Sequence, residues 1–120
     1  GKPAVTHYRV AEHFREHTRI RLRLETGRTH QIRVHMSYLQ HPLLGDLAYG
    51  GRARIPKGAS EELTQMIRSF DRQALHAVML RFEHPISGEE MEFHAPVPQD
   101  MIVMAEALRV DARDNKEDDI

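Results

Sequence analysis

The chain has 120 residues, 40% of them hydrophobic and 29% charged, which is enough for one modest core in a single domain. It has no cysteine and no apolar run long enough to span a membrane, which excludes disulfides and zinc-thiolate sites and suits a cytoplasmic protein. The net charge of −1 is unevenly distributed, because residues 9–35 carry seven arginines against three glutamates and residues 111–120 carry five acids against two bases. A basic half favours contact with a nucleic acid, and a solvated strand face is the alternative.

Alternating side chains predict two antiparallel strands at the start of the chain, over residues 5–12 and 17–25, joined around residues 14–16. In the first strand, one face carries Val5, His7, Arg9 and Ala11, and the other carries Thr6, Tyr8, Val10 and Glu12. In the second, Ile20, Leu22 and Leu24 point one way and Arg19, Arg21 and Arg23 point the other. The three arginines are either an RNA track or a solvated strand face.

A helix is predicted from His30 to Gln40, with Thr29 as its cap. Its buried stripe is expected to contain Ile32, Met36 and Leu39, which recur with helical spacing. Arg33 lies off this stripe, so its removal is expected to leave the fold nearly intact.

The rest of the chain alternates between loop, helix and strand. Residues 43–57 are rich in glycine and proline and predict a loop, and Ser60 begins a helix to about Phe70. Two strands are expected at 74–82 and 90–94, and a last helix from Pro98 to about Arg109. Residues 1–110 therefore predict an α+β fold, a mostly antiparallel sheet with short helices, followed by an acidic, disordered tail at 111–120.

Residues 24–35 form a strand, a glycine turn and a helix start, with Arg28 and Arg33 flanking the turn. Backbone N–H groups at a helix start attract anions, and a guanidinium suits a phosphate. This corner is either an anion- or nucleic-acid-binding site or an ordinary capped helix.

Four blocks follow one another in order along the chain. They are Thr-Gly-Arg-Thr-His-Gln-Ile-Arg-Val-His at 26–35, His-Pro-x-x-Gly-Asp-x-x-Tyr-Gly at 41–50, Arg-Gln-Ala-Leu-His-Ala at 72–77 and Phe-x-His-Pro at 82–85. With these blocks, residues 5–108 resemble the ribosomal large-subunit pseudouridine synthases. The likeness is greatest to a member that modifies the helix 69 stem-loop of 23S rRNA.

The resemblance implies half of a catalytic domain from a monomeric isomerase that converts uridine in large-subunit rRNA to pseudouridine, without cofactor, metal or membrane. In that family a carboxylate acts as nucleophile or base, and it belongs to a His-Arg-Leu-Asp block that these 120 residues do not contain. The N-terminal part of the same protein is therefore an expected partner, and the chain alone is expected to be inactive. A non-enzymatic RNA-binding module is the alternative.

The resemblance also assigns roles to individual residues. Arg33 is expected to form an ion pair with the catalytic aspartate, and Leu75 is expected to pack in the active site. Substrate contacts are expected from the first block, from Arg28, His30 and Gln31. Arg28 and His30 could equally support the turn. In the second block, Asp46 is predicted to be a turn or cap residue rather than a nucleophile, and Tyr49 should not be taken for the catalytic tyrosine.

Overall fold

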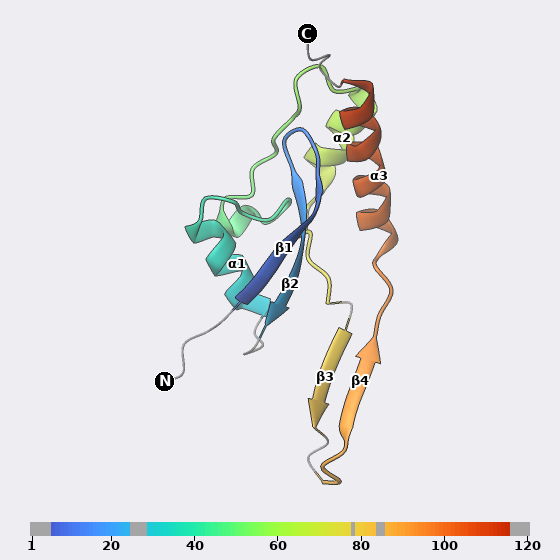
Figure 1. Cartoon of the computed structure of the whole chain (residues 1–120). Helices are drawn as coiled ribbons and strands as arrows, with labels where there is room; N and C mark the ends of the chain where they lie inside the picture. The colour runs from blue at the N-terminus through green and yellow to red at the C-terminus, as the bar shows by residue number, and fades with distance from the viewer. Residues whose placement is uncertain (1–5, 25–28, 78, 84–85, 116–120) are drawn as a thin grey trace.

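The computed structural model of the chain describes residues 6–24, 29–77, 79–83 and 86–115. It confirms an α+β fold, drawn out to about 58 × 32 × 28 Å. Figure 1 shows the β1–β2 hairpin beside α1, α2 and α3 at the tip of that hairpin, and the β3–β4 hairpin extending away from them. In the described residues the strands form two separate two-stranded antiparallel sheets, so the expected sheet is present as two hairpins.

The first hairpin consists of β1 (Thr6–His13) and β2 (Thr18–Leu24), as predicted. A bulge interrupts the ladder between Val10 and Glu12, since Val10 lies opposite Ile20 but Glu12 lies opposite Arg19. A bulge adds one residue to one strand and breaks its alternation. The prediction that Glu12 shares a face with Val10 is therefore wrong, because the bulge moves Glu12 to the arginine-bearing face.

The core lies between α2 (Glu61–Ser69) and α3 (Gln99–Asp114). Its buried side chains come from both helices and are Leu63, Ile67, Met104 and Leu108, and Phe14 at the tip of the first hairpin packs against them. Ser60 caps α2 as predicted, because its Oγ accepts a hydrogen bond from the N–H of Leu63 at 3.1 Å. Each fully buried side chain of this size contributes about 1.5–3 kcal/mol, so these few residues hold the tip and both helices together.

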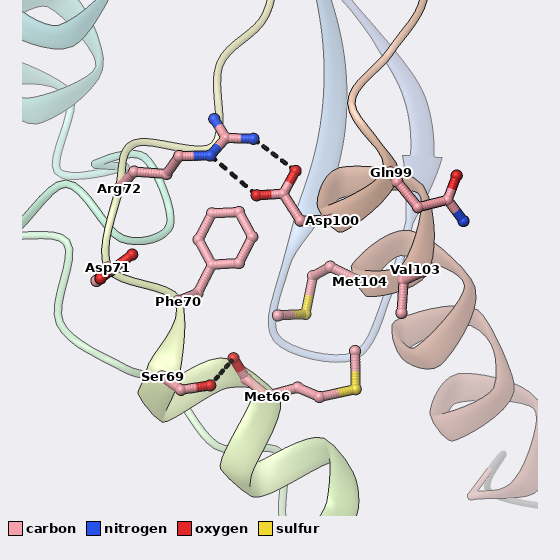
Figure 2. Close-up of a pocket in the computed structure, with 9 residues that line it drawn as sticks. All are labelled: Met66, Ser69, Phe70, Asp71, Arg72, Gln99, Asp100, Val103 and Met104. Carbon is pink, nitrogen blue, oxygen red and sulfur yellow. Dashed lines mark hydrogen bonds and ion pairs between the residues drawn. The ribbon is translucent and has the colours of Figure 1, made fainter.

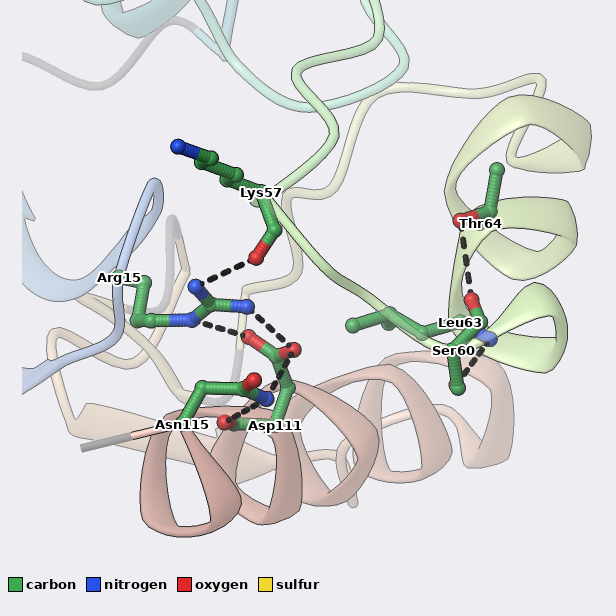
Figure 3. A network of polar contacts seen from close by, with 7 residues as sticks. All are labelled: Arg15, Lys57, Ser60, Leu63, Thr64, Asp111 and Asn115. Atoms are coloured by element: carbon green, nitrogen blue, oxygen red, sulfur yellow. Dashed lines mark hydrogen bonds and ion pairs between the residues drawn. The ribbon is translucent and has the colours of Figure 1, made fainter. Parts of the chain in front are cut away.

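α3 is longer than the sequence predicts, because it continues to Asp114. The expectation of a disordered tail from residue 111 is wrong for residues 111–114, and residues 116–120 lie outside the described part. Asp111 is buried and accepts two hydrogen bonds from Arg15 at the tip of the hairpin, at 3.0 and 2.8 Å (Figure 3). The acidic composition misled the prediction, since this carboxylate has a partner almost a hundred residues away in the sequence.

α1 (Thr29–Tyr38) ends two residues earlier than predicted. Gln40 adopts a left-handed conformation with φ of 63°, and the N–H groups of Gln40 and His41 donate to the carbonyls of Ser37 and Met36. This is the Schellman arrangement that closes a helix C-terminus. Ile32 is buried as expected, but Leu39 lies beyond the helix and is 54% exposed, so it does not belong to a buried stripe.

The second hairpin consists of β3 (Met79–Glu83) and β4 (Glu90–His94). β4 has the predicted bounds, whereas residues 74–77 are not a strand and follow α2 as an irregular segment. There His76 is half-buried and its Nε2 lies 3.3 Å from the carbonyl oxygen of Ala95. In the described residues no helix is long and apolar enough to cross a membrane.

Candidate functional site

Arg33 and Asp46 form a two-bonded ion pair between α1 and the loop that follows it. Nε and Nη2 of Arg33 donate to Oδ2 and Oδ1 of Asp46, both at 2.9 Å. The Asp46 side chain is only 3% exposed, and the Arg33 side chain is 22% exposed. A bidentate pair fixes the plane of the guanidinium as well as its position.

The loop holds Asp46 through its own backbone. The N–H of Asp46 donates to the carbonyl of Leu43, and the Asp46 carbonyl accepts from Tyr49 and Gly51 at 3.1 and 2.8 Å. The single-turn helix η1 (Leu47–Tyr49) begins directly after Asp46. Arg33 also lies over the Tyr49 ring, 4.8 Å from its centroid. The loop therefore offers the arginine a carboxylate on one side and an aromatic face on another.

A third segment, distant in sequence, packs against the same loop. The N–H of Ala74 donates to the carbonyl of Leu44 at 2.8 Å. Gly45 has φ of +79°, and a Cβ built there would lie 2.0 Å from the Arg72 carbonyl oxygen, so only glycine fits. The described parts of the blocks at 26–35, 41–50 and 72–77 thus come together around Asp46, and Leu75 lies half-buried beside this contact.

Arg33 keeps part of its binding capacity. A guanidinium has five N–H donors, and Asp46 occupies the Nε edge. Within the part of the chain that the structure describes, Nη1 of Arg33 makes no hydrogen bond. The hydrogen bonds to Asp46 raise the pKa of Arg33 despite the opposing effect of burial, so the cation is permanent. The free end can accept a second carboxylate or a phosphate.

The structure tests the other expected site residues only in part. Arg28 lies outside the described residues, and so does the side chain of His30. Nε2 of Gln31 donates to Thr6 Oγ1 at 2.9 Å, and Nδ1 of His35 lies 3.2 Å from the same oxygen. Gln31 therefore joins α1 to the open end of β1, a structural contact that the sequence did not predict.

The position of Asp46 at a turn is as predicted, but the ion pair with Arg33 was missed. Its side chain makes no cap hydrogen bond and binds Arg33 instead. The expectation that Arg33 can be removed at little structural cost overlooked this partner, because its loss leaves a buried carboxylate unpaired. No sequence signal connected Asp46 with Arg33, because the Gly-Asp-x-x-Tyr spacing places only an acid and an aromatic ring one turn apart.

A separate open groove of about 490 Å³ lies between the end of α2 and the start of α3 (Figure 2). Arg72 spans it, with Nε and Nη2 donating to the two carboxylate oxygens of Asp100 at 2.9 and 2.6 Å. The hydrogen bonds from Arg72 lower the pKa of Asp100. Both side chains are substantially exposed, and Arg72 also lies over the Phe70 ring. This pair joins the 70–77 segment to α3, and both of its charged groups bind each other. The Arg33 site is therefore the candidate for chemistry.

Sequence comparisons show which known proteins this chain resembles. The profile of the RNA pseudouridylate synthase family matches residues 1–38, which include Arg33. Ribosomal large subunit pseudouridine synthase D of Vibrio parahaemolyticus is 87% identical over 114 residues, 95% of this chain and 35% of that protein. The proteins of the same name from Salmonella typhimurium and Escherichia coli are 69% and 67% identical over 118 residues, in each case 98% of this chain and 36% of the relative. The chain therefore spans about a third of the length of these relatives.

Proposed function

Since this chain belongs to the ribosomal large-subunit pseudouridine synthase family, over about a third of the length of its relatives, we propose that it forms part of an enzyme that isomerises uridine to pseudouridine in large-subunit rRNA. We further propose the helix 69 stem-loop of 23S rRNA as the target and the cytoplasm as the location. We expect no cofactor, and no oxidant, reductant or group donor is consumed because substrate and product are isomers. The support for rRNA as the substrate is the name shared by the relatives.

The observation that carries the proposal is the anchored, incompletely used guanidinium of Arg33. Asp46 holds one edge at 2.9 Å, and Nη1 at the far end has no hydrogen-bond partner among the described residues. In the complete enzyme this end binds the catalytic aspartate, which a part of the protein outside these 120 residues supplies. A carboxylate in a water-poor site ionises only with such a partner, because desolvation favours its neutral form.

The reaction needs a carboxylate and a pocket rather than a metal. The bond from uracil N1 to the ribose C1′ breaks, the base turns, and a new bond forms between C5 and C1′. The proton on C5 is lost and N1 takes up a proton, so the atoms balance without a co-reactant. The target base must leave its stack first. Leu75 contributes an apolar wall to that pocket, and Arg28, His30 and Gln31 contribute substrate contacts.

A chimera tests the proposal directly. In it, this chain replaces the matching segment of the full-length Vibrio parahaemolyticus relative. The chimera is expected to form pseudouridine in a large-subunit rRNA transcript, as measured by mass spectrometry of nuclease digests. The 120-residue chain alone is expected to form none. Pseudouridine formed by the isolated chain would contradict the proposed origin of the carboxylate, and a chimera that binds RNA without turnover would favour the RNA-binding module.

A further inference from the structure

The bulge in β1 divides the outer face of the first hairpin into two parts with different charge. At the tip, Glu12 lies opposite Arg19, with Glu12 Oε1 3.4 Å from Arg19 Nε. Glu12 also accepts hydrogen bonds from Arg109 of α3 at 2.6 and 2.8 Å. The Arg109 hydrogen bonds are the main cause of the lowered pKa of Glu12, which is therefore ionised at neutral pH. Arg19 is neutralised within the chain.

Beyond the bulge, the residues of the same face that the structure describes are all basic. Arg9 lies directly opposite Arg21, and His7 lies directly opposite Arg23. All four residues are exposed. Of the acidic groups that the structure describes, none forms an ion pair with Arg9, Arg21 or Arg23. Like charges directly opposite one another destabilise a hairpin, so the Arg9–Arg21 pair costs the free protein stability, and an anionic partner would offset that cost.

The chemistry of that partner follows from what these arginines can bind. An apolar surface could not cover these three guanidinium groups, which pair with none of the described acids, because charges buried without partners carry a large desolvation penalty. Guanidinium groups bind phosphate oxygens in pairs of parallel hydrogen bonds. The two strands present them in a double row, which suits a repeating anion rather than a single ion.

From this register and charge distribution we infer that Arg9, Arg21 and Arg23 form a contact surface for the phosphate backbone of RNA, and that Arg19 does not belong to it. The inference rests on the proposed function, since it gives the substrate a contact surface in addition to the Arg33 site. The sequence alone grouped Arg19 with Arg21 and Arg23 and left Arg9 out. The strand register separates Arg19, which Glu12 neutralises, from the three arginines that pair with no described acid.

Salt dependence of RNA binding by the full-length chimera tests this surface. The probe is a large-subunit rRNA transcript, and the variants are Arg9→Ala/Arg21→Ala and, as the matched control on the same strand and face, Arg19→Ala. Each phosphate contact contributes about 0.7–0.9 to the slope of log K against log salt. The double variant should lose about twice that amount, and Arg19→Ala should leave the slope unchanged. Arg9→Lys/Arg21→Lys should retain it, which separates lost charge from lost folding.

Two results would overturn the inference: an unchanged slope for the double variant, or an equal loss for Arg19→Ala. Neither result touches the proposed function as long as the unsubstituted chimera forms pseudouridine. If the unsubstituted chimera forms none, the proposed function fails instead. A parallel measurement with anionic lipid vesicles should show no binding that depends on Arg9 and Arg21, and binding of that kind would also count against RNA as the partner.

Discussion

Two arginine–aspartate pairs of almost the same geometry occur in the chain, one at the tip of the first hairpin and one beside α1. Arg15 binds Asp111 at the tip, and Arg33 binds Asp46 beside α1. In each pair the aspartate side chain is nearly inaccessible, at 4% and 3% exposure, and the arginine is about a quarter exposed, at 25% and 22%. In each pair Nε and Nη2 are the donors. Burial and distances alone would assign the two pairs the same role.

The pairs differ in how completely the arginine is used. Nη1 of Arg15 donates to the Lys57 carbonyl at 2.7 Å, so all three nitrogens are engaged, and Asn115 binds Asp111 from the other side (Figure 3). Nη1 of Arg33 has no such partner among the described residues. A pair whose guanidinium nitrogens all donate within the chain joins elements and leaves no unused nitrogen for a ligand. An unsaturated pair of equal rigidity holds a charged donor ready for one.

The largest expected effect is a loss of activity when Arg33, but not Arg15, is substituted. Arg33→Lys in the chimera keeps the charge but loses the fork that binds Asp46 and a second carboxylate together. We expect kcat to fall by about a hundredfold or more, because each ~1.4 kcal/mol of lost transition-state stabilisation is tenfold in rate. KM should change little, since RNA affinity comes mostly from distributed phosphate contacts. Steady-state kinetics on an rRNA transcript measure both.

Arg15→Lys is the matched control for this experiment. It makes the same substitution in a pair of the same geometry, so kcat should stay near that of the unsubstituted chimera below the unfolding temperature. Similar losses of kcat in both variants would mean that the difference in saturation has no functional meaning. Near-normal turnover by Arg33→Lys would show that charge alone suffices and that the bidentate role is wrong.

The next largest effect is on stability at the tip. Asp111→Ala removes the carboxylate that joins Arg15 to α3 and leaves the guanidinium with only the Lys57 carbonyl. Breaking a fully buried ion pair costs about 3–5 kcal/mol, and partial exposure of Arg15 reduces the expected loss to about 2 kcal/mol. Chemical denaturation measures the change. Asp100→Ala, at an exposed pair, is the control and should cost far less.

A smaller effect depends on pH and also concerns the tip. His17 is half-buried, and burial lowers its pKa below the usual 6.5. The unfolded chain therefore binds a proton more readily than the folded chain does, and stability falls as pH drops through 6.5 towards the lower folded value. His17→Gln should make the loss of stability between neutral and mildly acidic pH smaller. Unchanged pH dependence of the denaturation midpoint would contradict this.

The smallest expected effect is on stability and tests the repulsion between arginines that face each other on the hairpin. Arg9→Thr removes the repulsion from Arg21 directly opposite. It should stabilise the protein by about 0.2–1 kcal/mol at low salt, the range for cross-strand pairs, and the gain should fade as salt screens the charges. Arg19→Thr loses its ion pair with Glu12 and should give no gain. Thermal melts at two ionic strengths compare the variants, and equal gains would show that the pairing of Arg19 is unimportant.

Local sequence signals predicted most of the fold. Alternation located β1 and β2, Ser60 located the start of α2, and the strand expected at 90–94 is β4. The errors occurred where a distant contact decided the outcome. Residues 111–114 read as an acidic tail because nothing local indicates that Arg15 binds Asp111. The bulge that moves Glu12 to the basic face also has no signal in its own strand.

The candidate site was predictable only as far as the family resemblance extended. That resemblance singled out Arg33, and the role it implies for Arg33 remains a proposal. It gave no reason to connect Arg33 with Asp46, thirteen residues further on, because the pairing depends on how the loop folds back over α1. The close approach of Gly45 to the Arg72 carbonyl was likewise invisible, since a glycine in a loop predicts a turn and not a neighbour.

The outlying position of the β3–β4 hairpin has a consequence for local opening of the chain. A two-stranded hairpin is at best marginally stable by itself, and Figure 1 shows this one projecting away from the helices that hold the core. Amide hydrogens in such a segment exchange through openings that leave the rest of the molecule folded. Exchange should therefore be fast in β3 and β4 and slowest at Ile67 and Leu108, which gives the chain a gradient of opening free energy from its projecting end to its core.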